Sequence, residues 1–297
     1  MKSGLRKICT SVVLCGLSLS ATSAFATDTL AKIQKTGTIV IGHRVSSQPI
    51  SYVVNGRPMG YAIDICNDVA AEIKKDLHMP NLRVVYKAVN PTERIPMLRS
   101  GQIDMECGTS AHSVIRDREV DFSTNYYMAE IRMAVKSNSP VQELDDLDKK
   151  TVVTTAGVIA DKYLKRSVRG QDLTIHKIYG QDHAQSFALL AAGKAEAFVG
   201  ADSTLAGLIA TSGHPHDYKI VGTALSVDPY AIMLPNNDPK MKAIADKVVT
   251  GLWHSGKMDQ LYKKWFLSPI PPRNIAVNMP LNKANKVLRA RPTDAGN

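Results

Sequence analysis

The chain has 297 residues, of which 44% are hydrophobic and 22% are charged, as in a globular protein of one or two domains. Its formal net charge is +10, but the basic residues are scattered and few aromatic residues lie among them, which argues against a nucleic-acid-binding protein. Beyond the N-terminal segment, charged residues interrupt every apolar run, which argues against a membrane span.

Residues 1–26 have the pattern of a secretory signal peptide. Three basic residues precede a short apolar stretch over 8–20, and a small-x-small cleavage site ends at Ala26. The apolar stretch is too short for a membrane anchor. We therefore expect cleavage after Ala26 and a soluble protein in the periplasm.

Cleavage changes the charge and the cysteine count of the mature chain. The segment carries three basic residues and no acid, so the net charge falls from +10 to +7. Of the four cysteines, Cys66 and Cys107 remain. The periplasm is oxidising, so a disulfide between them is possible, but sequence alone leaves open whether the two lie close enough to form it.

The first part of the mature chain alternates strands with helices. Short β-branched or apolar runs predict strands over 38–42, 82–86 and 103–106, and apolar residues at helical spacing predict helices over 60–75 and 92–100. This order predicts a parallel sheet with crossover helices.

A second unit of the same style follows. An extended run over 131–136 precedes it, and its predicted elements are, in chain order, a strand over 151–154, a helix over 157–167, a strand over 174–179, a helix over 184–192, a strand over 195–200 and a helix over 204–211. A further extended run over 231–234 and helices near 239–253 and 256–264 are left to complete the first unit.

These units predict an α/β fold of two lobes, each a mostly parallel sheet flanked by helices. The predicted boundaries are 27–135 and 227–280 for the first lobe, 136–226 for the second, and 281–297 for a basic tail that we expect to be flexible. The chain would cross between the lobes near 134–138 and near 224–230. A hinge of two strands permits the lobes to close on a ligand.

Candidate ligand-binding residues follow the predicted strands, because open α/β sheets bind ligands at the carboxyl ends of their strands. These candidates are cationic or hydroxyl side chains, namely Arg44, Arg94, Thr109, Arg116, Thr155 and His183. Arginine offers carboxylates a bidentate fork, and Thr155 leads into a helix N-terminus, which favours anions. Each arginine alone is typical of a surface ion pair, but their shared position in the topology indicates an anion with more than one carboxylate.

Several motifs carry a family resemblance, and they cover nearly the whole mature chain. They are Gly60-Tyr61…Asp64, Thr109…Arg116…Asp121-Phe122-Ser123, Gly42-His43-Arg44, Arg94-Ile95-Pro96, Glu106-Cys107-Gly108, Asp182-His183…Ser186-Phe187 and Trp265-Phe266…Pro269-Ile270-Pro271-Pro272. The chain resembles the polar amino-acid-binding proteins of ABC importers, and within them the glutamate/aspartate-binding branch. Pro91 stands where the branch has Ser, and the adjacent Thr92 is a further ligand-binding candidate.

The resemblance implies separate roles for the two ends of the ligand. Arg44, Arg94 and His183 would hold the distal carboxylate. Arg116 and the region of Thr155 would hold the α-carboxylate.

The amino-acid end departs from the branch. Thr109 would contact the α-amino group, but the Asp that pairs with the ammonium in the branch falls on Ala201, with Asp202 one place on. Adjacent strand residues point to opposite faces, so Asp202 can substitute only if the strand has already ended. Ala111 and Val158 stand where hydroxyls are expected. The ligand is therefore glutamate, aspartate or a dicarboxylate without the amine.

The predicted function is the substrate-binding component of an ABC importer that delivers an acidic amino acid to a membrane permease, as a monomer. The alternatives are a receptor for an amine-free dicarboxylate, a sensory receptor, or a dehydratase-type enzyme whose acid would be Glu93, Glu106 or His183. No nucleotide-binding motif or metal-ligand cluster stands out, so we expect no cofactor and no metal.

Overall fold

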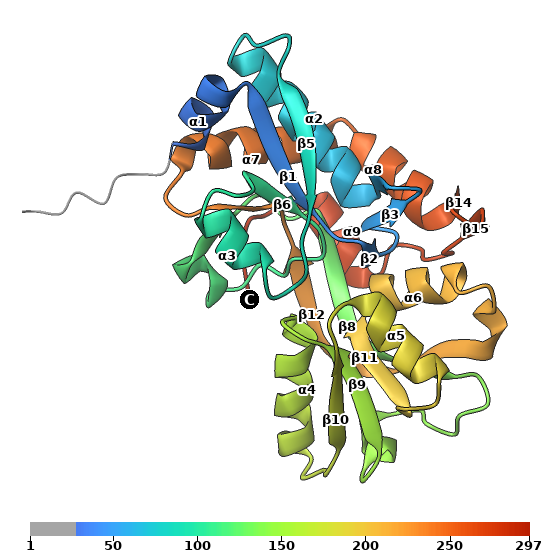
Figure 1. Ribbon diagram of the computed structural model, residues 1–297. Coiled ribbons are helices and arrows are strands. Elements are labelled where there is room, and N and C mark those ends of the chain that lie inside the picture. The colour runs from blue at the N-terminus through green and yellow to red at the C-terminus, as the bar shows by residue number, and fades with distance from the viewer. Residues whose placement is uncertain (1–27) are drawn as a thin grey trace, which may run out of the picture.

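The computed structural model describes residues 28–297, and the predicted signal peptide lies outside them. Two five-stranded sheets form the cores of two lobes, which confirms the predicted α/β architecture (Figure 1). The first sheet has the strand order β5 (Arg83–Ala88), β1 (Thr38–His43), β6 (Met105–Cys107), β13 (Met233–Pro235) and β7 (Val120–Phe122). The second has the order β10 (His176–Gly180), β9 (Thr151–Thr155), β11 (Ala197–Ala201), β8 (Tyr127–Lys136) and β12 (Tyr218–Tyr230).

Each sheet is parallel on one side and antiparallel on the other. Strand β1 pairs in parallel with β5 and β6, whereas β13 is antiparallel to β6 and β7. Strand β9 pairs in parallel with β10 and β11, whereas β8 is antiparallel to β11 and β12. The parallel strands therefore end at a common edge in each lobe, where a ligand is expected.

Helices cover the sheets with their apolar faces. Around the first sheet lie α1 (Thr29–Thr36), α2 (Tyr61–Asp76), α3 (Arg94–Arg99), α7 (Pro239–His254) and α8 (Lys257–Tyr262). Around the second lie α4 (Ile159–Gly170), α5 (His183–Ala191) and α6 (Asp202–Thr211). In α2 the buried face includes Tyr61, Ile65, Val69 and Ile73, as the helical spacing of these residues predicts. None of the helices within 28–297 has the length and apolar character that a membrane crossing requires.

Strands β8 and β12 run side by side from one lobe into the other and form the hinge (Figure 1). Their pairing extends from Tyr127 opposite Tyr230 to Ile131 opposite Ser226, and the register then shifts. The second crossing falls where it was expected, but the first lies earlier than the predicted 134–138, because β8 already pairs with β11 from Ile131 onward. An apolar run in the sequence does not reveal which sheet the strand joins. The first crossing was therefore predicted too late in the chain.

The two lobes are in contact across the cleft. The backbone N–H of Ala184 in α5 donates to the Ser46 hydroxyl of β2 (Ser46–Ser47) at 3.3 Å. A Cβ atom added to Gly157 would lie 2.8 Å from the methyl carbon of Thr92. A Cβ atom on Gly207 would overlap the backbone of Gln48, so glycine is required for this approach. The structure is therefore that of the closed form.

A small three-stranded sheet extends the first lobe beside the cleft. Strands β2, β3 (Ser51–Val54) and β4 (Arg57–Met59) pair antiparallel in sequence order. This sheet carries Ser51, whose hydroxyl accepts the backbone N–H of Arg44 at 3.0 Å. It therefore helps to fix the segment that leaves β1 for the cleft.

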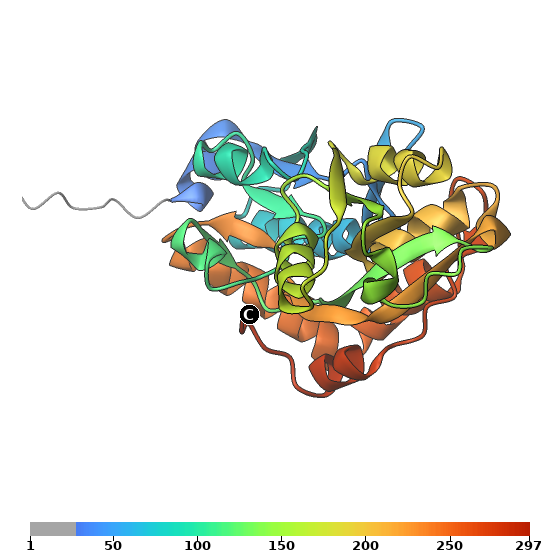
Figure 2. The same ribbon diagram turned by 90° about the horizontal axis from the view of Figure 1, so that it is seen from below.

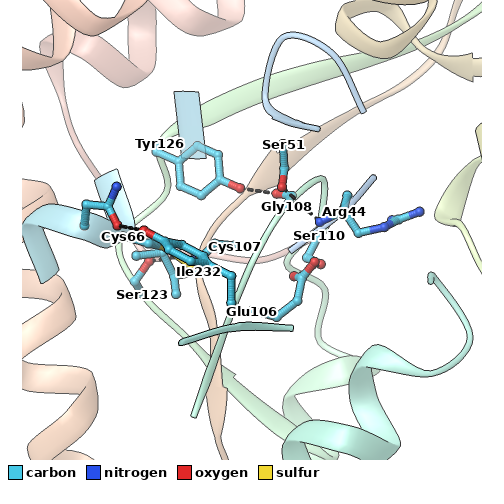
Figure 3. The surroundings of a disulfide bond; sticks show 12 residues. Arg44, Ser51, Cys66, Glu106, Cys107, Gly108, Ser110, Ser123, Tyr126 and Ile232 are labelled. Carbon is cyan, nitrogen blue, oxygen red and sulfur yellow. Dashed lines mark hydrogen bonds between the residues drawn. A yellow bond between two sulfur atoms is a disulfide. The ribbon is translucent and has the colours of Figure 1, made fainter. Parts of the chain in front are cut away.

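Cys66 and Cys107 form a disulfide, which decides the question that sequence left open. The bond joins α2 to β6 within the first lobe. Figure 3 shows that Cys107 and its neighbour Glu106 leave β6 in different directions, one toward Cys66 and the other toward Ser110. The disulfide thus anchors the strand that carries Glu106.

The C-terminal segment differs from the prediction of a flexible tail. After the short pair β14 (Pro269–Ile270) and β15 (Ile275–Ala276), it forms α9 (Lys283–Ala290) and returns to the body of the protein (Figure 2). Asn285 is 2% exposed, and its side chain bonds both the N–H and the carbonyl of Met128 in the hinge. These contacts depend on the folded hinge surface, so composition alone could not reveal them.

Candidate functional site

A cavity lies between the lobes at the carboxyl ends of their parallel strands. The space around it that no protein atom fills is about 330 Å³, and this includes space open to solvent. The first lobe contributes Thr109, Ala111 and Arg116, and the hinge contributes Ile131 and Tyr230. The second lobe contributes Thr155, Val158, Ile159, Ala160, His183, Phe198, Val199, Gly200 and Ala201. Residues far apart in the sequence thus meet at the place that the topology predicted.

Arg44 and Arg94 are buried cations next to the cavity, and neither is among the residues that line it. Each is 1% exposed; Arg44 follows β1, and Arg94 opens α3. Arg94 donates from Nη1 to the carbonyl of Thr109 at 3.4 Å. Among the described residues, Nε and Nη1 of Arg44 and Nε of Arg94 have no hydrogen-bond acceptor. Buried donors without partners are costly, so this pair is suited to bind an anion.

Arg94 lies close enough to Arg44 and Arg116 for its charge to lower the pKa of both. Burial and then the charge of Arg94 lower the pKa of Arg44 to about 10, and Glu106 opposes this shift. Burial and then Arg94 also lower the pKa of Arg116 to about 9. Arg116 is half-buried, and its Nη1 donates to the carbonyl of Ala111 at 2.8 Å. Three neighbouring guanidinium groups repel one another, and an anion between them would relieve this repulsion.

Glu106 is a component of the site that the sequence did not identify as ligand-related. It is fully buried on β6, and one carboxylate oxygen accepts the Ser110 hydroxyl at 2.5 Å. Its charge favours the protonated forms of Arg44 and Arg116. A Cβ atom on Gly108 would lie 2.5 Å from Glu106 Oε1, so the glycine permits this close packing. The signal in the sequence was an acid at the carboxyl end of a strand, followed by Cys and Gly.

Thr155 and His183 meet on the second-lobe side of the cavity. The hydroxyl of Thr155 lies 2.9 Å from His183 Nδ1 and 2.8 Å from the hydroxyl of Ser186. His183 opens α5, which Asp182 caps by accepting the N–H of Gln185. Burial, with Arg44 and Arg94 nearby, holds the pKa of His183 well below its ordinary value. The imidazole is therefore neutral, and Nε2 remains available to a ligand.

The two remaining threonine candidates occupy different environments. Thr109 lines the cavity, and its hydroxyl lies 3.5 Å from that of Ser47. Thr92 is exposed, and its hydroxyl donates to Asn90 Oδ1 at 2.8 Å instead. The Asn90 side chain also accepts the N–H of Glu93, so this group forms the turn that precedes α3. The structure does not bring Thr92 to the cavity.

Asp202 begins α6, because β11 ends at Ala201. Its carboxylate accepts three hydrogen bonds on the hinge side of the lobe: from the N–H of Ser203 at 2.7 Å, the N–H of Glu130 at 3.2 Å and the hydroxyl of Tyr127 at 3.3 Å. Burial raises the pKa of Asp202 to about 7. Ala201 lines the cavity and Asp202 does not, so this candidate also has a position away from the cavity.

Two lobes with mixed sheets, which correct the predicted mostly parallel ones, two connecting hinge strands and a charged cavity between the lobes define a type II periplasmic binding protein. Comparison with known families leads to the same class. The chain belongs to family 3 of the bacterial extracellular solute-binding proteins, whose profile matches residues 39–268.

Two characterised relatives match almost the whole chain. The chain is 37% identical to the L-glutamate/L-aspartate-binding protein of Pseudomonas aeruginosa, over 96% of this chain and 95% of that protein. It is 35% identical to the glutamate/aspartate import solute-binding protein of Escherichia coli, over 98% of each chain. These matches confirm the resemblance that the motifs indicated.

Solved structures with lower identity share the fold. A cysteine-binding protein from Campylobacter jejuni superimposes with a TM-score of 0.72 at 22% identity, covering 86% of this chain and 97% of that one. An ancestral amino acid-binding protein, a precursor of cyclohexadienyl dehydratase, gives a TM-score of 0.69 at 22% identity, covering 80% and 99%. At such identities the likeness supports the fold alone.

Proposed function

We propose that this protein is the substrate-binding component of an ABC importer and captures a small solute with two carboxylate groups. The observation that carries the proposal is the buried pair Arg44 and Arg94, whose guanidinium groups retain free donors among the described residues. Together with Arg116 they gather three positive charges, which Glu106 and, to a smaller extent, Asp182 and Asp228 oppose. Carboxylate groups of a ligand would complement the buried arginine donors that have no partner within residues 28–297.

The names of the relatives support glutamate and aspartate as the ligands. A second candidate, a dicarboxylate without an amine, is supported by the position of Ala201 in the cavity wall and by the hydrogen bonds of Asp202 on the hinge side. Both candidate ligands would bind the arginines through their carboxylates. Only the amino acids also require acceptors for an ammonium group beside the second carboxylate.

The proposed mechanism is capture by lobe closure. A ligand would first engage the arginines of the first lobe, and rotation about β8 and β12 would then bring Thr155 and His183 onto it. A micromolar Kd corresponds to about −8 kcal/mol, which a few charge-assisted hydrogen bonds supply after ordering costs. The closed lobes would present one composite surface to a permease, as a monomer in the periplasm.

Binding without turnover is supported by the environments of the three acids considered for an enzyme. Glu93 is exposed in the turn before α3. Glu106 accepts the hydroxyl of Ser110 and lies beside Arg44. His183 is held at Nδ1 by Thr155. Incubation with a bound ligand, followed by mass spectrometry, should return the ligand unchanged.

Calorimetric titration of refolded, ligand-free protein tests the proposed function. L-glutamate, L-aspartate, glutarate and succinate would be compared with L-lysine, which carries an additional positive charge instead of a second carboxylate. We expect at least one of the four acids to bind with a micromolar or lower Kd, and L-lysine not to bind. If none of the acids binds, or L-lysine binds as tightly as they do, the proposed function is wrong.

A further inference from the structure

The cavity wall around Ala201 is apolar. Ala201 ends β11, and Phe198 and Val199 of the same strand also line the cavity. Val158 and Ile159, where α4 begins, and Ala111 of the first lobe complete this wall. None of these side chains accepts a hydrogen bond.

No acidic side chain is among the described residues that line this cavity. The carbonyl of Ala111 already accepts Arg116 at 2.8 Å, and the carbonyl of Thr109 accepts Arg94 at 3.4 Å. The carboxylate of Asp202 accepts its hydrogen bonds on the hinge side. An ammonium group has three donors and no acceptor, so it would find neutral hydroxyls, those of Thr109 and Tyr230, but no carboxylate here.

Two further buried carboxylates act on the arginines. Asp228 accepts the hydroxyl of Ser226 at 2.6 Å and does not line the cavity. Glu106 has one oxygen, Oε1, without a hydrogen-bond donor among the described residues. This oxygen packs against Gly108 and lies beside Arg44, and Glu106 is not one of the residues that line the cavity. Its charge acts on Arg44 and Arg116. It is therefore not positioned for an ammonium group at the Ala201 wall.

The fixed charges around the cavity also oppose a cation. Arg116 lines the cavity, with Arg94 close enough to lower its proton affinity. The N-terminus of α4, a helix of 12 residues, reaches the cavity at Ile159 and adds partial positive charge. A carboxylate is favoured at this end, and an ammonium group beside it is repelled.

We propose that this protein selects a dicarboxylate that carries no ammonium group at the Ala201 wall, in preference to the matching acidic amino acid. The inference rests on the proposed function, because it takes the capture of a two-carboxylate solute as given. The apolar wall contacts the ligand's carbon chain, and Arg116 holds the carboxylate next to it.

Paired titrations of the mature protein test the inference, with glutarate against L-glutamate and succinate against L-aspartate. We expect the better amine-free acid to have a Kd about tenfold lower, or more, than that of its amino-acid partner. Equal affinities, or tighter binding of the amino acids, would overturn the inference and leave the proposed function intact. If no acid binds, the inference and the proposed function are both wrong.

The variant Ala201→Asp supplies a negatively charged partner for an ammonium group. We expect it to shift the ratio of the two Kd values about tenfold or more toward the amino acids. Ala201→Asn adds a side chain of the same size without charge and should leave the ratio near that of the wild type. A ratio that stays unchanged in folded Ala201→Asp protein would contradict the inference.

A second variant covers the case in which Ala201→Asp does not fold. Asp202→Asn keeps the side chain's shape and its acceptor oxygen for Ser203 and Glu130. We expect the preference between glutarate and L-glutamate to be unchanged in this variant. A selective loss of L-glutamate binding would show that Asp202 serves the ammonium group and would overturn the inference.

Discussion

The two walls of the cleft differ in the side chains that they present to a ligand. The first lobe presents buried cations whose donors are not all used, with Arg44 and Arg94 each 1% exposed. The second lobe presents one polar corner, at Thr155 and His183, and an apolar stretch that ends at Ala201. We therefore propose that affinity for an acid depends on the first wall and that the choice among acids depends on the second.

The walls also differ in how they are held. The first wall is carried by strands that the disulfide between Cys66 and Cys107 ties to α2, and a buried carboxylate balances part of its charge. The second wall depends on hydrogen bonds between side chains, such as Thr155 to Ser186 at 2.8 Å. The two walls therefore differ in the kind of contact that holds them in place.

The largest effect should come from removing one buried cation. Arg94→Ala should weaken binding of the preferred acid about 1,000-fold or more, because it removes charge-assisted hydrogen bonds in a desolvated cleft. Calorimetry measures the loss. Arg99→Ala is the matched control, since Arg99 lies in the same helix and its side chain is 59% exposed. Binding of wild-type strength in folded Arg94→Ala protein would refute the assignment of the first wall.

Loss of the disulfide should lower stability more than affinity. The bond closes a loop with a sequence separation of 41 residues, for which chain entropy gives about 4 kcal/mol as an upper value. Urea unfolding of the double variant Cys66→Ser/Cys107→Ser should show a lower free energy of unfolding. Its Kd should change by less than about threefold under native conditions, because neither sulfur lines the cavity. A large change in Kd at full folding would mean that the bond also shapes the site.

Asp202 should make the folded state less stable as the pH rises. Its folded pKa is about 7, above the ordinary value of 3.8, because of burial and to a lesser extent the charge of Glu130. The folded state therefore holds the proton more tightly, and stability is lost between about pH 4 and pH 7. Asp202→Asn cannot ionise, so it should raise the free energy of unfolding by a few kcal/mol at pH 7.5 and leave it nearly unchanged at pH 3.5.

The comparison of wild type and Asp202→Asn across pH cancels the titration of other groups, including His183. Urea midpoints at several pH values are the measurement. The prediction would be wrong if the variant gained as much stability at pH 3.5 as at pH 7.5, since the gain would then have no connection with ionisation.

The smallest effect should come from the C-terminal segment. Asn285→Ala removes two hydrogen bonds to the backbone of Met128, both 2.8 Å, and should cost about 1–3 kcal/mol of stability. Lys286→Ala is a control on the same helix that leaves these bonds in place; Lys286 is exposed. Thermal unfolding compares the two variants. Equal melting temperatures for the two would show that α9 does not support the hinge.

Much of the fold could be predicted because the local patterns agree with the global arrangement. Runs such as 38–42 and 151–154 are strands, and the helices from 60, 184 and 204 lie within a few residues of their predicted positions. The wrong predictions concern segments whose local sequence does not reveal which part of the fold they pack against. The run over 131–136 belongs to the second sheet, and 283–290 forms a helix whose polar Asn285 is buried against the hinge.

For the site, the sequence by itself determined which residues could meet, because residues that follow parallel strands gather at one edge of a sheet. It therefore predicted that Arg44, Thr109 and Thr155 would gather at the cleft; Thr109 and Thr155 line the cavity, and Arg44 is buried without lining it. Only the tertiary structure decided where the acids point. Glu106 turns toward the arginines, and Asp202 turns toward the hinge. The direction of a side chain at a strand end is set by contacts with distant segments, and no local pattern contains them.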